Sequence, residues 1–440
     1  MFDYLLLDRN RFKIIYIQVV KFVMDYYLGI DFGTSGARGI VIDREKKIVI
    51  AVDRLFPNQI DYNLELSWRK ALYSLLEQIP LNIRKYLKAI AINGTSATVL
   101  LCDERGNPIT KPLLYNDNRG KFLLEKIEKI APRNHVVISA TSSLAKFFWY
   151  QQQPFFKEAK YFLHQADWLG FLLHGKLGIS DYHNALKLGY DVEQLCYPNW
   201  LQNISDRDLF PQVLSPGTLV REVTQEVGDR FSFPKNCIIC TGTTDSIAAF
   251  LASGATQPGE AVTSLGSTLV LKLLSETKIE NSQYGIYSHR LGNLWLTGGA
   301  SNTGGAVLKH FFSDEQLKEL SAQIDTNVTS SLEYYPLLKP GERFPINDPN
   351  LAPQLSPRPD NPVGFLHELL SGMARIEALG YTKLQELGAS PLTQVYTAGG
   401  GAKNTTWERI RHDYLQIPVV AAKNTAAAYG TALLAFNAIY

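Results

Sequence analysis

Two carboxylates in this chain stand where an apolar segment gives way to a glycine-containing turn, and Asp31 is the first of them. It ends residues 26–31 and is followed by Phe-Gly-Thr-Ser-Gly. Small residues in such a turn let backbone N–H groups approach phosphate oxygens, and a neighbouring carboxylate can hold Mg²⁺ through water. A plain hairpin turn explains the same pattern, so this motif alone leaves both interpretations open.

Asp245 is the second carboxylate. It follows a strand-like run at residues 236–242 and a Gly-Thr turn, and it begins a segment with the pattern of a helix, residues 246–253. An Asp at this position commonly caps a helix. It can also act as a general base toward a substrate hydroxyl. The spacing does not choose between capping and catalysis.

Three further glycine-rich turns lie at junctions between strands or between a strand and a helix. They cover residues 266–268, 297–305 and 398–404. Backbone N–H groups at such junctions suit nucleotide contact. Neither a Walker A motif nor G-x-G-x-x-G occurs in the sequence, which excludes the P-loop and Rossmann interpretations.

The elements that must position these turns occur in two similar runs of strand, strand, strand, helix and strand. Residues 29–43 open the first run and residues 264–274 belong to the second; each places a Gly/Ser/Thr turn between apolar strands. We therefore expect two related lobes, residues 24–220 and 221–440. The other expected elements are a helix at 61–80, strands at 88–93 and 98–102, a mostly helical section at 121–201 and a surface loop at 339–362.

Residues 1–23 form a separate problem. The segment is partly apolar, but Asp8, Arg9 and Arg11 interrupt it, and it lacks the basic start and cleavage site of a signal peptide. Met24 directly precedes the first strand. We expect Met24 to be the natural start and residues 1–23 to be a non-native or disordered extension.

Composition bounds the class of protein. The 440 residues include 44 basic and 42 acidic side chains, which gives no footprint for nucleic acid, and no run of 18 apolar residues suggests a membrane span. Cys237 and Cys240 have C-x-x-C spacing but lack the second pair of a zinc ribbon, so buried thiols in a reducing cytoplasm are expected. None of the eight histidines shows metal-site spacing.

Taken in order, the motifs resemble those of the FGGY family of carbohydrate kinases, from about Tyr26 to the C-terminus. The matching segments are residues 29–35 (first phosphate motif), 115–119 (Trp-x-Asp-x-Arg, with tyrosine for tryptophan), 143–153 (first signature), 242–245 (catalytic base) and 399–404 (nucleotide loop). Tyr150 departs from the first signature, and residues 370–374 depart from the second.

This resemblance implies an α/β, actin-like (ribonuclease H-like) fold, with sugar in the first lobe and ATP mainly in the second. It implies that ATP and Mg²⁺ are required and that Asp245 takes a proton from a sugar hydroxyl, which attacks the γ-phosphate in line. Asp31 would organise Mg²⁺, and Thr34 would lie at the transferred phosphate. The residues implied to contact ATP are Thr34, Gly266, Thr268, Gly400, Gly401 and Asn404.

The turn at residues 93–98 bears on the choice of sugar. It lacks the Gln-Met-His of xylulose kinases and the Gln-Arg-Glu of glycerol kinases. That turn, the short chain and the sequence Asp-Phe-Gly-Thr-Ser-Gly-Ala-Arg resemble compact cyanobacterial and plant D-ribulose kinases. The residues implied to face the sugar are Asp31, Ser35, Gly36, Arg38, Ser96 and Asp245. For Arg38, a solvated or ion-paired strand residue is an almost equal alternative.

Other functions stay open at this point. The acceptor could be D-xylulose, L-ribulose or glycerol, and the protein could act as a monomer or a homodimer. An actin-like protein that uses nucleotide to change shape and bind partners would share the Asp31 and Gly399 motifs, but would not need Lys146 and Trp149 of the first signature. A sugar sensor without catalysis would not need Asp31, Thr34 and Asp245 together.

Overall fold

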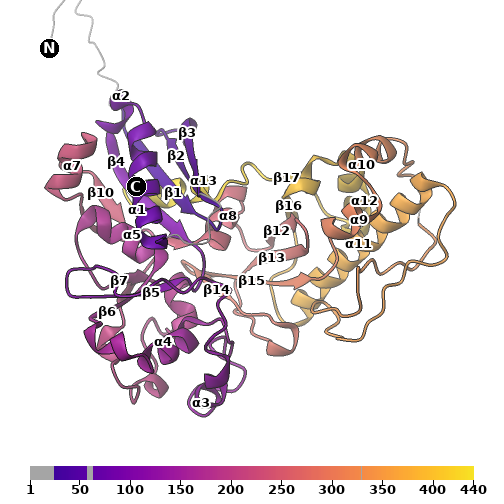
Figure 1. Cartoon of the computed structure of the whole chain (residues 1–440). Helices are drawn as coiled ribbons and strands as arrows, with labels where there is room; N and C mark the ends of the chain where they lie inside the picture. Colours follow the sequence, from indigo (N-terminus) through magenta and orange to yellow (C-terminus); the bar gives the residue numbers. More distant parts are fainter. Residues whose placement is uncertain (1–23, 57–62, 329) are drawn as a thin grey trace, which may run out of the picture.

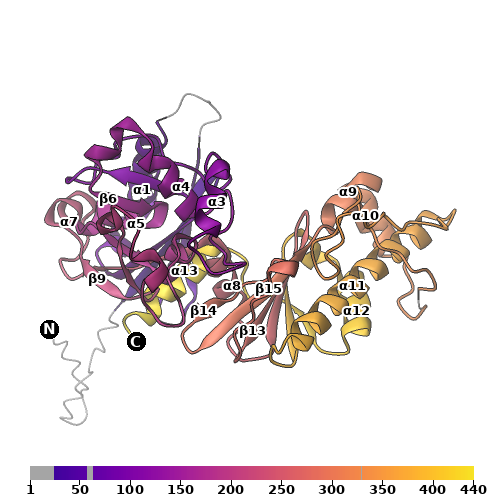
Figure 2. The ribbon, with the colours of Figure 1, turned by 90° about the horizontal axis from the view of Figure 1, so that it is seen from below.

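The computed structural model describes residues 24–56, 63–328 and 330–440, so the expected extension at residues 1–23 lies outside the described residues. The described chain is a mixed α/β structure with two lobes, each built around a sheet (Figure 1). The view from below shows the lobes side by side, joined near helix α8 (Asp245–Ser253) and strand β14 (His289–Leu291) (Figure 2).

The first sheet has the strand order β3-β2-β1-β4-β10-β9, with β11 also paired to β4. Its strands are β1 (Tyr26–Phe32), β2 (Gly36–Ile42), β3 (Ile48–Leu55), β4 (Leu87–Gly94), β9 (Leu219–Glu222), β10 (Ile238–Cys240) and β11 (Thr243–Thr244). Helix α1 (Leu64–Gln78) begins at the cap Asn63 and buries Trp68, Leu72 and Leu75 on one face, as its apolar spacing predicts.

A long insertion separates β4 from β9. It contains β5 (Val99–Cys102), β6 (Tyr161–His164), β7 (Ile179–Asp181), β8 (Gln212–Leu214), the helices α3 (Leu124–Glu128), α4 (Ser143–Gln151), α5 (Gln165–His174) and α6 (Tyr182–Ala185), and short 3₁₀ turns. The expectation of a mostly helical section missed β6 and β7. Each pairs with a strand distant in sequence, β5 or β8, so local periodicity does not reveal it.

The second sheet has the order β14-β15-β13-β12-β16-β17. Its remaining strands are β12 (Glu260–Leu265), β13 (Leu269–Ser275), β15 (Leu294–Ser301), β16 (Gln394–Ala398) and β17 (Val419–Ala421). Four helices accompany it: α9 (Gly305–Phe311), α10 (Asp314–Ser321), α11 (Pro362–Glu386) and α12 (Thr405–Leu415). The side chain of Arg411 on α12 forms a buried ion pair with Glu377 on α11, with 2.6 Å between Nε and Oε2.

The two sheets repeat one arrangement. In the first, β1 pairs antiparallel with β2 and parallel with β4. In the second, β12 pairs antiparallel with β13 and parallel with β16. The two lobes therefore share one strand arrangement. Within the described ranges, no helix combines the length and apolar character needed to cross a bilayer.

The junction between the lobes differs from the expected boundary at residues 220 and 221. That boundary falls inside the first sheet, because β10 and β11 both pair with β4 across the insertion. Helix α8 follows directly and packs Ile247 and Phe250 against Val262 and Leu274 of the second sheet. The strand pairing therefore places the junction between the lobes at α8 and the segment that follows it, and not at residues 220 and 221.

Helix α13 (Ala427–Asn437) returns from the second sheet to the first. It lies so close to β1 that a Cβ on Gly29 would come within 2.0 Å of the backbone nitrogen of Ala432. Asn93 of β4 donates a hydrogen bond from Nδ2 to Thr431 Oγ1, at 2.6 Å. Helix α13 therefore packs on the face of the first sheet that carries the polar side chains described next.

Candidate active site

Four polar side chains form a row across the first sheet. The strand register places Asp31 opposite Arg38 on one side and Asn93 on the other, and Asn93 opposite Thr243. Directly paired residues project from the same face of a sheet, and neighbouring strands are about 4.8 Å apart. The row therefore runs from Arg38 to Thr243, two residues before Asp245.

Asp31 is only partly exposed, and its pKa is raised to about 6. Burial is the largest cause and the negative charge of Asp245 the second, while Asn93 and Arg38 act in the opposite direction. The strand register accounts for this effect, because Thr243, two residues before Asp245, lies beside Asn93, and Asn93 lies beside Asp31. The two aspartates singled out from separate motifs are thus brought together by the fold.

Asp245 is the first residue of α8, and Thr244 occupies the cap position without a side-chain cap bond. The carboxylate Oδ1 of Asp245 accepts from the backbone N–H of Ser246 at 2.7 Å. Burial raises the pKa of Asp245, while that hydrogen bond, Lys272 and Lys187 lower it. Its Oδ2 makes no hydrogen bond with any described residue, which leaves one oxygen to accept a proton.

The residues around Asp31 fit a hydrated Mg²⁺ ion. Asp31 Oδ1 and Asn93 Oδ1 are buried and have no hydrogen-bond partner among the described residues. Such oxygen atoms need a partner, and water on a hard cation would supply one. No group of three or more His, Cys, Asp or Glu side chains in the described ranges could hold a metal directly. A single carboxylate acting through water is what Mg²⁺ commonly uses.

The turn between β1 and β2 presents Thr34 and Ser35 at an exposed tip. Its ends are joined by a hydrogen bond from Gly33 N to Gly36 O at 3.0 Å. A Cβ on Gly36 would approach the backbone oxygen of Arg54 to 2.7 Å, so the close approach of β3 requires glycine there. Arg38 is exposed on β2 beside Asp31, which is compatible with either of its two interpretations.

Helix α4, which carries the first signature, holds the turn that contains Ser96. The buried Lys146 Nζ donates to the carbonyls of Ala97 at 2.8 Å and Leu114 at 2.7 Å. Burial lowers the pKa of Lys146 to about 7. Thr95 is fixed separately, since its N–H donates to Gln165 Oε1 at 3.0 Å. Lys146 therefore shapes the turn.

Trp149 of α4 holds the 115–119 segment in a similar way. The guanidinium of Arg119 lies over its ring, 4.6 Å from the centroid, and also pairs with Asp117 at 2.8 Å. Both signature residues thus support loops at the edge of the first lobe.

The glycine-rich turns of the second lobe also meet. Parallel pairing of Ser264 with Ala398 places the turn after β12 beside the turn after β16. Gly399 has φ of 85°, and a Cβ there would lie 2.6 Å from Leu265 O, whereas a Cβ on Gly400 would meet nothing within 4 Å. Gly266 O accepts from Gly305 N at 2.8 Å, which ties the first of these turns to α9.

The other residues predicted to contact ATP already have close neighbours within the second lobe. Asn404 caps α12: its Oδ1 accepts from Trp407 N at 3.0 Å and its Nδ2 donates to Ser321 Oγ at 2.9 Å. A Cβ on Gly401 would lie 2.7 Å from the Trp407 ring. Thr268 lies directly against Gly304 at the start of α9. A contact of Asn404, Gly401 or Thr268 with ATP stays a prediction.

Sequence reasoning missed two residues that touch the segment carrying Asp245. His183 Nδ1 lies 2.7 Å from Thr243 Oγ1, and Lys272 Nζ donates to Ser246 O at 2.6 Å. The sequence does not single out His183, because no histidine in it has the spacing of a metal site. Asp181 and Asn184 form a recognisable helix-capping pattern around His183, but no local pattern shows what its ring reaches.

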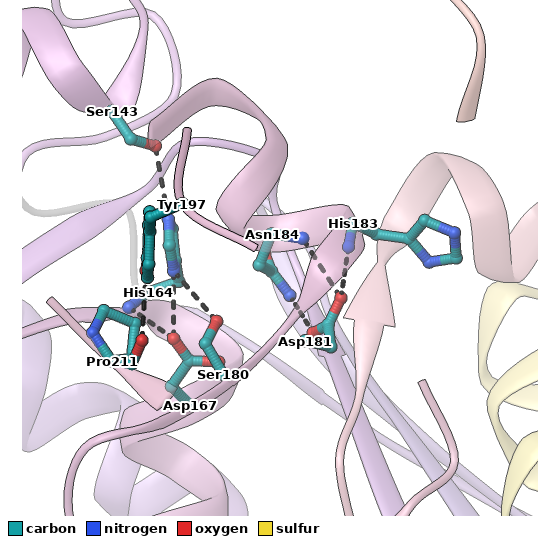
Figure 3. Close-up of polar contacts among 9 residues, drawn as sticks. All are labelled: Ser143, His164, Asp167, Ser180, Asp181, His183, Asn184, Tyr197 and Pro211. Carbon is teal, nitrogen blue, oxygen red and sulfur yellow. Dashed lines mark hydrogen bonds and ion pairs between the residues drawn. The ribbon is translucent and has the colours of Figure 1, made fainter. Parts of the chain in front are cut away.

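A second histidine, His164, has a serine and an aspartate as neighbours (Figure 3). Its Nδ1 lies 2.9 Å from Asp167 Oδ2, and its Nε2 lies 3.3 Å from Ser143 Oγ. Ser143 and His164 are 0% exposed, so a substrate cannot reach them. This is a buried network that holds α4, β6 and α5 together. The expected buried thiols, Cys237 and Cys240, are also confirmed.

Comparison with known proteins agrees with this geometry. The sequence model for the N-terminal domain of the FGGY family of carbohydrate kinases matches residues 26–252, and that for the C-terminal domain matches residues 261–439. A xylulose kinase of Staphylococcus xylosus is 23% identical over 94% of this chain and 90% of its own length.

Solved structures share the fold at lower identity. A gluconate kinase from Lactobacillus acidophilus has a TM-score of 0.79 and 16% identity, covering 94% of this chain and 89% of its own. The glycerol kinase of Plasmodium falciparum, solved with ADP, has a TM-score of 0.77 and 18% identity, covering 94% and 90%. These relatives act on different acceptors, so the fold alone does not identify the sugar. The family matches span both lobes, and the chain belongs to the FGGY family of carbohydrate kinases, as an ATP-dependent sugar kinase.

Proposed function

We propose that this kinase transfers the γ-phosphate of ATP to the terminal O5 of a ketopentose, D-ribulose, giving D-ribulose 5-phosphate. The observation that supports a catalytic centre is the pair of Asp31 and Asp245 at one sheet edge, with the charge of Asp245 raising the pKa of Asp31. The glycine-rich turns of the second lobe supply backbone groups suited to nucleotide contact.

In this mechanism Asp245 Oδ2 accepts the proton of the O5 hydroxyl. O5 then bonds to the γ-phosphorus while the bond to the bridging β–γ oxygen breaks, and ADP leaves. Asp31 would hold Mg²⁺ through water, and bound Mg²⁺ supplies positive charge at the phosphates. The Thr34–Ser35 tip would lie at the transferred group. Gly266, Thr268, Gly400, Gly401 and Asn404 would contact ATP.

Support for D-ribulose comes from the turn that carries Ser96. It offers small side chains, and Lys146 and Gln165 hold its backbone. Ser35, Gly36, Arg38 and Ser96, with the two aspartates, would face the sugar. The resemblance of the first motif to D-ribulose kinases points the same way.

D-xylulose is the second candidate. It is favoured by the full-length match to the Staphylococcus xylosus xylulose kinase. The two sugars are epimers, so the preference depends on which hydroxyl finds a buried polar partner. A site built around such hydrogen bonds can reject a mismatched analogue by as much as ~10⁴-fold.

The experiment is a comparison of kcat/KM for D-ribulose, D-xylulose, L-ribulose and glycerol at saturating MgATP, with the position of the phosphate assigned by NMR. We expect D-ribulose to give the highest value and phosphate on O5. A tenfold advantage for D-xylulose or glycerol would replace the sugar assignment. ATP turnover that no sugar in a broad panel stimulates would contradict the placement of the catalytic centre.

We also propose that the enzyme works in the cytoplasm, as a monomer or homodimer, with ATP and sugar as its partners. All four cysteines are free thiols, a state that a reducing compartment preserves. Light scattering of the purified protein would determine the oligomeric state.

A further inference from the structure

His183 connects the segment before Asp245 to the second sheet. It lies on α6, is 2% exposed, and places Nδ1 2.7 Å from Thr243 Oγ1 and Nε2 2.6 Å from the carbonyl oxygen of Arg290. A carbonyl can only accept, so Nε2 carries the proton. A neutral ring then accepts the Thr243 hydroxyl at Nδ1, and burial lowers the pKa of His183 to about 4, which keeps the ring neutral.

The first turn of α6 fixes the backbone from which this ring projects. Asp181 Oδ1 accepts from the backbone N–H of His183 at 2.8 Å and of Asn184 at 3.0 Å, and Asp181 Oδ2 accepts from Asn184 Nδ2 at 2.6 Å. The His183 ring points away from the His164 network (Figure 3). The first lobe therefore holds the backbone from which the ring projects, and the ring itself is held by its hydrogen bonds to Thr243 and Arg290.

On the far side, Arg290 belongs to β14 of the second sheet. Its guanidinium Nη1 donates to the carbonyls of Val192 and Glu193, each at 3.1 Å. Strand β14 is thus joined to the first lobe at two places: at His183 through its backbone and at residues 192–193 through its side chain. A shift of β14 relative to the first lobe must strain or move the His183 hydrogen bond.

A second contact holds the other end of the same short segment. Lys272 of β13 donates to Ser246 O at 2.6 Å, directly after Asp245. Thr243 and Ser246, which flank the aspartate, are therefore both tied to strands of the second sheet, through His183 and Lys272 respectively. The position of Asp245 depends on the second lobe although its strand β11 pairs within the first.

We propose that His183 is a positioning residue that makes the placement of Asp245 depend on the contact between the two lobes. The inference rests on the proposed role of Asp245 as base. The Arg290 carbonyl, the imidazole and the Thr243 hydroxyl form one relay of hydrogen bonds. When the lobes are in the arrangement seen here, the relay holds the turn before Asp245. When β14 moves away, the turn loses its support and the base is less well placed.

The test is a double-mutant cycle between His183→Phe and Thr243→Val. Phe keeps a ring of similar size without the two hydrogen bonds, and Val is close to Thr in shape. We expect each single variant to lower kcat on the order of tenfold, with KM for ATP changed less than twofold. Because both changes break one relay, the double variant should be no slower than the slower single variant.

Two further variants separate positioning from packing. His183→Gln supplies an amide donor and acceptor and should recover most of kcat. His174→Phe is the matched control: His174 is also buried, and its Nδ1 accepts from Lys176 N at 3.0 Å, but among the described residues it makes no hydrogen bond with the 243–246 segment. It should lower the melting temperature without lowering kcat.

The proposal is overturned if folded His183→Phe keeps the wild-type kcat, or if the two losses multiply in the double variant. Should His183→Phe not fold, Thr243→Val alone carries the test, because it removes the hydroxyl partner of His183, and a wild-type kcat of Thr243→Val overturns the proposal. Asp245→Ala is assayed in parallel. Wild-type activity of Asp245→Ala would reject the base itself, whereas an inactive Asp245→Ala beside fully active His183→Phe and Thr243→Val would reject only the coupling.

Discussion

The two lobes share a strand arrangement but differ in the residues at the strand end just before the glycine turn. In the first lobe Asp31 precedes the glycine turn, with Arg38 and Asn93 as its neighbours across the sheet. In the second lobe Ser264 holds the equivalent place, with Val270 and Ala398 beside it. One repeated framework therefore carries a charged row on one side and small, mostly apolar side chains on the other.

This difference divides the work between the lobes. Charged side chains can organise a cation and accept a proton, so the proposed mechanism assigns the chemistry to the first sheet and to Asp245. Small side chains leave backbone N–H groups accessible, so the second sheet suits contact with phosphate and nucleotide. The following predictions test this division.

The largest expected effect is at Asp245. Asp245→Ala should keep ATP binding and lower kcat by about 10²–10⁴-fold, the range for loss of a general base. Ser264→Ala, the matched change on the second sheet, should stay within a few-fold of wild type. Steady-state kinetics and calorimetric ATP titration of both variants make the comparison, and near-wild-type turnover of Asp245→Ala would exclude it as the base.

Asp31 should affect the metal requirement. If it holds Mg²⁺ through water, Asp31→Ala should raise the Mg²⁺ concentration for half-maximal activity by about 10–100-fold, as loss of an outer-shell partner does. The measurement is a Mg²⁺ titration at saturating ATP and sugar. An unchanged titration and rate would make Asp31 a turn residue only.

Adjacent glycines of the second lobe should respond differently. Gly399→Ala forces a side chain into left-handed backbone and against Leu265 O, and should cost about 1–3 kcal/mol of stability. Gly400→Ala meets open space and should leave stability unchanged while raising KM for ATP. Chemical unfolding and ATP kinetics distinguish the two. Equal losses of stability in the two variants would contradict the left-handed backbone and the close contact described for Gly399.

His183, at the contact between the lobes, should make the free energy of unfolding depend on pH. The pKa of His183 is lowered from 6.5 to about 4, so its neutral form contributes stability that is lost as pH falls from 6.5 toward 4. His183→Gln lacks this loss and should gain about 2 kcal/mol relative to wild type between pH 7 and pH 5.

The pH comparison needs both proteins because Asp181 has the opposite effect. Burial raises its pKa to about 7, so it favours the folded state as pH falls, in wild type and variant alike. The difference between the two unfolding curves cancels the contribution of Asp181 and reports on His183 together with His289, whose ring centroid lies 5.9 Å away and whose pKa is lowered by burial and by His183. A difference that does not change with pH would show that the imidazole is not kept neutral by burial.

The sequence predicted the parts of this molecule that depend on local signals. Apolar runs ending at Gly/Ser/Thr turns located β1, β2, β12 and β13, because strand and turn preferences act over a few residues. Asp31 and Asp245 were found in the same way. Whether Asp245 capped its helix could not be decided, since that depends on which backbone N–H groups its side chain meets.

The rest depended on contacts between distant residues. The register that brings Thr243 beside Asn93 spans the whole insertion, so the boundary at residues 220 and 221 was placed too early. The short strands β6 and β7 exist because β5 and β8 pair with them. His183 acquires its significance only from Arg290 in the other lobe. Neither periodicity nor spacing encodes such partners.

The return of α13 to the first sheet has a consequence for synthesis of the protein. Tyr27, Ile40 and Ala91 form an apolar face that Ala428, Ala432 and Ala435 cover. On the ribosome, every strand of that sheet emerges well before residues 427–437 do. At ~5–20 residues per second the face stays uncovered for roughly 10–40 seconds. A nascent chain must therefore be protected from aggregation during this interval, and the first lobe can mature only after most of the second has been translated.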